Sequence, residues 1–219
     1  NMSNKIIDLF KTPLYITKID LNYKSLASYC LSLQKKDKGR KISNVGGWQS
    51  GNLTHKTLGP LKPLLSSIKK EADKFTEQIG LKPMRGIASA WININDYKDS
   101  NQIHNHPHSV LSGVYYIQTP KDCGTIDFYH PAADLLAYDW RNMVKKDYNN
   151  YNSHSWWQDS KPGLLYLFPG WGGGSSSNND RVFMPYANTI IVKPTVESCL
   201  KAMGFPEDYF DQMPTLSET

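Results

Sequence analysis

Hydrophobic residues recur every three or four positions in two early segments of the chain. In residues 23–34 these positions are Leu26, Tyr29, Cys30 and Leu33. Asn22 stands just before this segment and is a suitable helix N-cap. In residues 61–79 the same spacing is followed by Gly80, a residue type that commonly ends helices. The pattern therefore predicts two amphipathic helices in the first 80 residues.

From residue 87 onward the pattern changes to short runs of apolar or alternating residues. Turns rich in Gly, Pro, Asn and Asp separate these runs, which cover residues 87–95, 110–117, 125–129, 164–168 and 189–192. A β-branched and aromatic stretch within residues 6–20 predicts one earlier strand. This pattern favours an all-β sandwich or barrel that follows the helices.

Two segments lack this regular pattern. Residues 131–161 form a long polar insertion rich in aromatic residues, which we interpret as a loop or a lid over a site. Residues 194–219 contain at most one short helix, near 196–203, before a polar end. We expect a single domain over residues 1–193, with a helical part to about residue 82 and a β core from 83. Residues 194–219 are then a C-terminal extension.

Composition narrows the classes of protein. The chain has 219 residues and a net charge of +5, and its one dense basic run, at 35–41, is interpreted as a solvated loop rather than a nucleic-acid site. Its three cysteines form no CxxC pair, which favours a reducing compartment. We expect a cytoplasmic protein without a signal peptide or membrane partner. The Gly-X-Ser-X-Gly, P-loop and GxGxxG motifs are absent, and the oligomeric state is not predicted.

The most informative local feature is a cluster of histidines at 104, 106 and 108, between a polar loop and an apolar strand. Imidazole is the commonest protein ligand of transition metals. A His-X-His spacing puts His104 and His106 on one face of an extended segment and turns Asn105 away from it. The spacing therefore predicts a metal site at these two residues. His108 either reaches the metal or substrate or lies on the surface.

Four motifs occur in order: SNVGGWQS at 43–50, WIN at 91–93, NQIHNHPHSVLSGVYYI at 101–117 and GLLYLFPGW at 163–171. Together they resemble the 2-oxoglutarate/Fe(II)-dependent oxygenases, in the uncharacterised branch with a His-X-His-Pro…Ser-Gly-Val-Tyr-Tyr signature. The resemblance covers about residues 40–193. It implies a mainly β fold, a double-stranded β-helix of the jelly-roll or cupin-like kind, with N-terminal helices packed outside.

The resemblance also implies an activity and its cofactors. A dioxygenase of this kind uses Fe(II) and the cosubstrate 2-oxoglutarate, which is converted to succinate and CO₂ while a C–H bond of the substrate is hydroxylated. His104 and His106 are then the catalytic metal ligands. His106 stands where related oxygenases have Asp, so a neutral ligand replaces a charged one. The substrate, a small molecule or a peptide, is not identified.

By the same resemblance, four further residues bind the cosubstrate. Arg181 matches the arginine whose fork clamps the far carboxylate of 2-oxoglutarate. Tyr115 offers a hydroxyl donor, Asn93 an inward amide, and Asn188 matches an asparagine of the closing strand. The alternatives are an ordinary surface arginine for Arg181, a core or exposed tyrosine for Tyr115, and a water-facing amide for Asn93.

The third metal ligand departs from the family pattern. The family has a histidine three residues after the tryptophan of its Leu-Phe-Pro-Ser-Trp motif, and here that position is Gly174, which has no side chain. The candidates that remain are His130, His154, Asp127 and Asp180. Two other hypotheses therefore stay open: a non-catalytic oxygenase fold, and a cupin-like module that binds a metal or a small acid.

Overall fold

The computed structural model describes residues 4–106, 109–120, 123–132, 147–170, 174–175 and 188–193, the last two ranges by their backbone alone. Its helices are α1 (Tyr23–Gln34), α2 (His55–Leu58) and α3 (Lys62–Gln78), with a 3-10 turn at Gly59–Leu61 before α3. Its strands are β1 (Tyr15–Lys18), β2 (Asn44–Val45), β3 (Trp48–Gln49), β4 (Ser89–Ile94), β5 (Ser100–Asn101), β6 (Leu111–Gln118), β7 (Thr125–Tyr129), β8 (Ser155–Asp159), β9 (Leu164–Pro169), β10 (Gly174–Ser175) and β11 (Asn188–Lys193).

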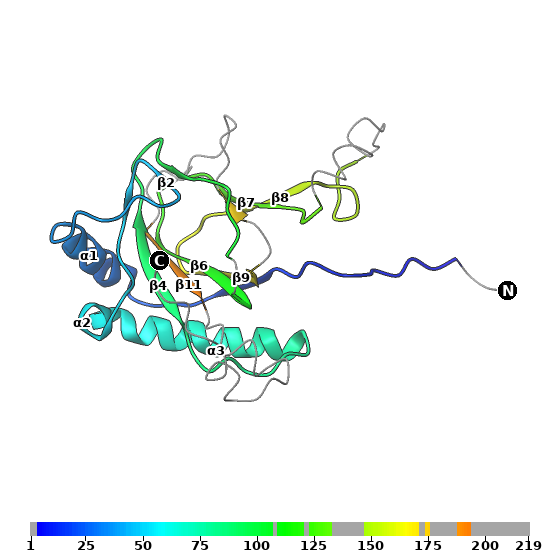
Figure 1. Cartoon of the computed structure of the whole chain (residues 1–219), viewed down its shortest axis with the longest axis horizontal. Coiled ribbons are helices and arrows are strands. Elements are labelled where there is room, and N and C mark those ends of the chain that lie inside the picture. Colours follow the sequence, from blue (N-terminus) through cyan, green and yellow to red (C-terminus); the bar gives the residue numbers. More distant parts are fainter. Residues whose placement is uncertain are drawn as a thin grey trace, which may run out of the picture.

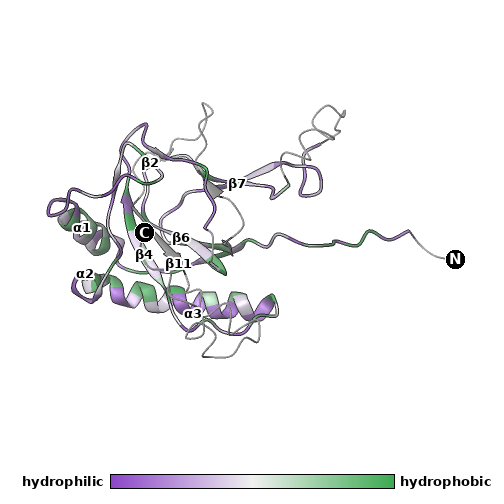
Figure 2. Ribbon diagram, viewed as in Figure 1, coloured by the Kyte–Doolittle hydropathy of each residue, from purple (hydrophilic) through white to green (hydrophobic). Residues whose placement is uncertain are grey.

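Helices α1 and α3 confirm the two predicted helices and show why they start and stop where they do. The side chain of Asn22 accepts a hydrogen bond from the Ser25 amide and caps α1. After α3, Gly80 has φ +77°, and the next amide, of Leu81, donates to the Thr76 carbonyl at 2.8 Å. Figure 2 shows that the hydrophobic positions of α3 lie on the side that faces the sheet.

The strands form a large antiparallel sheet and two smaller ones. The large sheet has the order β1-β9-β6-β11-β4-β3, the second has the order β10-β7-β8, and β2 pairs with β5. In Figure 1 the helices lie on one side of the large sheet, and β7 and β8 lie on the other. The described chain is therefore mainly β, with a few helices outside, as expected.

One hydrophobic cluster lies on each face of the large sheet. The cluster on the helix side joins α1 and α3 to alternate residues of β4, β6 and β9, with Leu61, Leu64 and Ile68 fully buried. The cluster on the other side comprises Val114, Tyr116, Ile126, Tyr166 and Phe168 and lies between the large sheet and β7. We call this second side the inner face, because it is enclosed between two sheets.

The predicted strands agree with the observed ones apart from small shifts at their ends, whereas β8 and the two-residue strands β2, β3, β5 and β10 were not predicted. Strand β8 lies within residues 131–161, which were predicted to be a loop or lid. No described helix is long and apolar enough to span a membrane. The helix predicted near residues 196–203, like the whole of 194–219, lies outside the described residues.

Candidate metal and substrate site

The rings of His104 and His106 lie close together at the end of the loop before β6. Their ring centroids are 4.9 Å apart with an interplanar angle of 51°. His106 is buried, His104 is half-buried, and Asn105 between them is exposed, as the strand-like alternation predicted. The structure therefore brings the two predicted ligands together.

Each ring is held through its Nδ1 atom. Nδ1 of His106 lies 2.6 Å from Ser112 Oγ on β6, and Nδ1 of His104 lies 2.7 Å from the Gln102 carbonyl. The His106 main chain is anchored as well, because its amide donates to the Gly170 carbonyl just after β9 at 2.9 Å. A metal would therefore bind both residues through Nε2, with each Nδ1–H donating to its oxygen partner.

The spacing of the two rings fits one metal ion. Imidazoles bound at about 2.1 Å and about 90° apart on one ion place their ring centroids about 4.6 Å apart. The observed 4.9 Å is close to this value. Fixed Nδ1 partners are the arrangement that metal-binding histidines usually show. The pair therefore suits a divalent transition metal such as Fe(II).

The described residues do not supply a third protein ligand. No group of three His, Cys, Asp or Glu side chains that could hold a metal occurs among them. Gly174 lies in β10 opposite Phe128 of β7 and has no side chain to offer. Asp127 alternates with the inward-facing Ile126 and accepts a hydrogen bond from Thr125, so its carboxylate lies on the other face of β7. Burial raises the pKa of Asp127, while the Thr125 bond opposes that rise.

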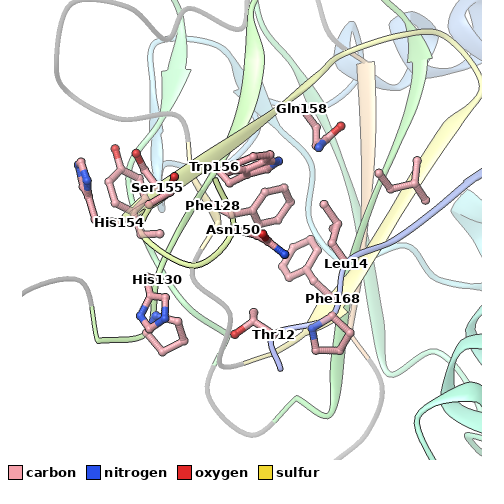
Figure 3. Close-up of a pocket in the computed structure, with 15 residues that line it drawn as sticks. Thr12, Leu14, Phe128, His130, Asn150, His154, Ser155, Trp156, Gln158 and Phe168 are labelled. Atoms are coloured by element: carbon pink, nitrogen blue, oxygen red, sulfur yellow. The ribbon is translucent and has the colours of Figure 1, made fainter. Parts of the chain in front are cut away.

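The two histidine candidates lie in a different cavity. His130 and His154 line a space of about 340 Å³ between the segment that leads into β1 and the β7–β8 hairpin. Figure 3 shows them at one end of this cavity, with Phe128, Trp156 and Phe168 beside it. Neither His104 nor His106 is among its lining residues. Asp180, the remaining candidate, lies outside the described residues.

The histidine pair itself opens into a larger cavity, of about 550 Å³. Its described lining consists of Arg40, Ile42, Ser43, Gln49, Ser50, Asn52, Ser89, Trp91, Gln102, Ile103, His104, Asn105 and His106. The ring of Trp91 meets that of His106 edge-on, with 6.0 Å between centroids. Arg40 is the one charged side chain in this described lining, and none of the described lining residues carries a carboxylate. The cavity is therefore suited to an anionic ligand beside a metal.

Asn93 lies on the inner face, as its predicted role requires. It is 2% exposed, and its Oδ1 has no hydrogen-bond partner among the described residues. Its direct neighbours across the sheet are Gln49 on β3 and Thr189 on β11. The Oε1 atom of Gln49 is likewise buried without a described partner. Asn95 Oδ1 is also buried without a described partner, although the Nδ2 group of the same side chain donates to Asn101 Oδ1 at 3.1 Å.

The structure does not bring Tyr115 to the histidines. Tyr115 belongs to the cluster on the helix side, and its hydroxyl donates to the Ile19 carbonyl at 2.9 Å. Strand alternation puts Tyr116 on the inner face instead, in the cluster with Tyr166. Burial raises the pKa of both Tyr115 and Tyr116 well above the usual value. The hydroxyl role expected for Tyr115 is therefore wrong for this geometry, since the residue is part of the core.

Three other expectations lie outside the described side chains. Arg181 and His108 are not described, and Asn188 is described only by its backbone, which pairs with Gln118 in β6. Conversely, the sequence did not single out Ser112, Arg40 or Gln49. The basic run that contains Arg40 was interpreted as a solvated loop, and only the SNVGGWQS motif gave a signal for Gln49.

Comparison with known families agrees with the motif resemblance. The model of a family described as "Putative 2OG-Fe(II) oxygenase" matches residues 89–180. This range includes both histidines and Gly174, and it ends just before Arg181. The resemblance recognised from the motifs is therefore confirmed. No curated protein matches the chain.

Comparison with solved structures supports the same fold. A prolyl-4-hydroxylase from Pseudomonas putida superposes with a TM-score of 0.59 at 8% identity, covering 84% of this chain and 93% of its own. A Trichoplax adhaerens prolyl hydroxylase, solved with a peptide fragment of a hypoxia-inducible factor, gives 0.58 at 11% identity and 84% coverage of both chains. The α-ketoglutarate-dependent carbocyclase SnoK from nogalamycin biosynthesis gives 0.55 at 11% identity, with coverages of 84% and 80%. At these identities the likeness concerns the fold alone.

Proposed function

We propose that this protein is a dioxygenase that uses Fe(II) and 2-oxoglutarate to hydroxylate a substrate bound in the cavity beside His104 and His106. The observation that carries the proposal is the pair of adjacent imidazoles, each fixed through Nδ1, within the region that the family model matches. We further propose that residues 1–193 form one domain, whose two facing sheets make a double-stranded β-helix.

In this proposal His104 and His106 hold the metal through Nε2. Bound iron and 2-oxoglutarate supply the oxidising chemistry, in which the cosubstrate loses CO₂ to give succinate. Ser112 and the Gln102 carbonyl keep the rings oriented, and Trp91 shields His106 from solvent. Asn93, which is buried on the inner face, is a candidate donor to the cosubstrate through its Nδ2–H groups. Arg181 is the candidate for the far carboxylate of 2-oxoglutarate, and Asn188, on the closing strand, is a further candidate contact.

The neutral ligands have an energetic consequence. Two imidazoles leave both charges of a divalent ion uncompensated, whereas the usual aspartate removes one of them. The dianion 2-oxoglutarate can supply the missing negative charge. We therefore expect weak binding of the metal alone and tighter binding with 2-oxoglutarate, and by linkage the metal tightens cosubstrate binding by the same factor.

The test combines binding with turnover. Fe(II) is titrated anaerobically into the protein with and without 2-oxoglutarate, and succinate is then measured after O₂ is admitted. We expect His104→Ala and His106→Ala each to weaken metal binding by about 100-fold and to abolish succinate formation. His55→Ala is the matched control, because His55 is exposed on α2 and lies outside the cavity lining. Wild-type protein that binds no metal would refute the proposal.

A second candidate function is a module that binds a metal or a small acid without turnover. The glycine at position 174, where the family has a histidine, favours it. This candidate predicts the same loss of metal binding in the two alanine variants, but no succinate from wild-type protein under any condition. Succinate formation that requires both histidines would exclude it.

A further inference from the structure

Arg40 projects into the cavity of the histidine pair from a segment far away in sequence. Its amide donates to the Gln49 carbonyl at 2.8 Å, so the segment is bridged to β3 at the edge of the large sheet. Its guanidinium lies over Gly51, where an added Cβ would come within 3.1 Å of a terminal nitrogen. Gly51 therefore leaves the room that the guanidinium occupies.

The positive charge of Arg40 is not neutralised by any described acidic side chain. No described Asp or Glu forms an ion pair with Arg40, and no carboxylate is among the described lining of the cavity. The residue is solvent-exposed at the rim of the cavity, whereas Asn93 is buried. A guanidinium that faces a cavity without an acidic partner suits an incoming carboxylate, which it can bind with two parallel hydrogen bonds.

Gln49 provides a second, independent polar contact in the same lining. It is 5% exposed, and its Oε1 is buried without a hydrogen-bond partner among the described residues. Leaving such an atom unpaired costs about 1–3 kcal/mol. A ligand N–H or O–H group that reaches this oxygen removes that cost. The main-chain bridge between Arg40 and Gln49 keeps the two contacts adjacent.

We propose that Arg40 and Gln49 form the recognition site for the substrate, and that the substrate is a carboxylic acid with a neighbouring hydrogen-bond donor, as in amino acids and hydroxy acids. The carboxylate binds Arg40, and the donor binds Gln49 Oε1. The single cation in the described lining matches a singly charged carboxylate better than a phosphate dianion. This inference rests on the proposed function for the assignment of the cavity as the substrate site.

Three probes that share a phenylpropanoyl frame separate these contacts. N-acetyl-L-phenylalanine carries both groups, N-acetyl-L-phenylalaninamide lacks the charge, and 3-phenylpropionate lacks the donor. Their affinities are measured by ligand-observed NMR in metal-free protein, so that binding is judged independently of turnover. We expect wild-type protein to prefer the first probe to the amide by about tenfold. Arg40→Gln removes this preference, and Gln49→Met removes the preference over 3-phenylpropionate.

Lys41→Gln is the matched control, because it removes one positive charge from the adjacent exposed residue, which does not line the cavity. It should leave all three affinities unchanged. Equal binding of acid and amide by wild-type protein, an equal loss in Lys41→Gln, or no binding of any probe would overturn the proposal.

A competition experiment separates the substrate from the cosubstrate. The probes are measured again with saturating 2-oxoglutarate, and the affinity for 2-oxoglutarate is measured in Arg40→Gln. We expect both ligands to bind together and the cosubstrate affinity to stay unchanged. If 2-oxoglutarate displaces the acid and loses affinity in Arg40→Gln, Arg40 serves the cosubstrate and the proposal is wrong. Absence of succinate with acid binding intact would instead refute only the proposed dioxygenase activity.

Discussion

Ser112→Ala removes the partner of one proposed metal ligand without touching the ligand itself. Ser112 is 1% exposed and His106 is 7% exposed, and 2.6 Å separates Ser112 Oγ from His106 Nδ1. Substitution leaves a buried ring nitrogen without this oxygen, which costs about 1–3 kcal/mol of folding free energy. For a domain of this size, each kcal/mol lowers the melting temperature by about 2–4 °C.

The effect on metal binding is distinct from this loss of stability. Without the hydroxyl, Nδ1 of His106 loses the oxygen that favours its Nδ1–H tautomer and helps to orient the ring. Loss of such a partner typically weakens metal binding 10–100-fold, which corresponds to about 1.4–2.7 kcal/mol. We therefore expect a 10–100-fold rise in the Fe(II) dissociation constant, measured by anaerobic calorimetry well below the melting temperature of the variant.

The control for this measurement is Ser66→Ala, which deletes a hydroxyl from an exposed position of α3. It should change neither the metal affinity nor, to any large extent, the melting temperature. If Ser112→Ala is less stable but binds Fe(II) as tightly as wild-type protein, Ser112 does not orient the ligand. If His106→Ala is equally without effect, the metal site itself is wrongly assigned.

Two further predictions follow from hydrogen bonds of the core. Tyr115→Phe removes the hydrogen bond to the Ile19 carbonyl and should lower the free energy of unfolding by about 1 kcal/mol. The melting temperature should fall, and the affinity for 2-oxoglutarate should stay unchanged. A fall in that affinity would contradict the placement of Tyr115 in the core. Burial and the 2.7 Å bond to Glu71 raise the pKa of Tyr15 from 10.0 to about 12, so its contribution to stability is complete below pH 10 and is lost as the pH rises toward 12. Tyr15→Phe should therefore show a shallower fall of the free energy of unfolding from pH 10 to 12 in urea titrations, and an unchanged slope would refute this linkage.

Elements with strong local signals were predictable from the sequence. The bounds of α1 match the predicted 23–34, because an N-cap and an apolar stripe occur together there. Strand β7 matches 125–129 because Gly124 and the polar segment after it delimit the run. Strand β8 was missed since its Trp156 and Trp157 are 43% and 63% exposed, which leaves no alternation of apolar and polar residues.

The candidate site was predictable only where one segment supplies it. His104 and His106 come from a single extended stretch, so their spacing alone places them together. The sequence could not show whether Tyr115 or Tyr116 lies on the inner face. Strand β6 is buried on both faces from Leu111 to Ile117, so its residues do not alternate between apolar and polar. Arg40 reaches the same cavity through its bridge to Gln49 and the pairing of β3 with the distant strand β4, which no local pattern encodes.

The large sheet begins and ends with strands from the first 50 residues of the chain. Its order places β1 at one edge and β3 at the other, with the later strands between them. Open strand edges invite pairing with other chains and hence aggregation. Strand β1 covers the outer edge of β9, and β3 covers that of β4. Both edges of the large sheet are therefore very short strands, of four residues in β1 and two in β3, which leave little length for pairing with another chain.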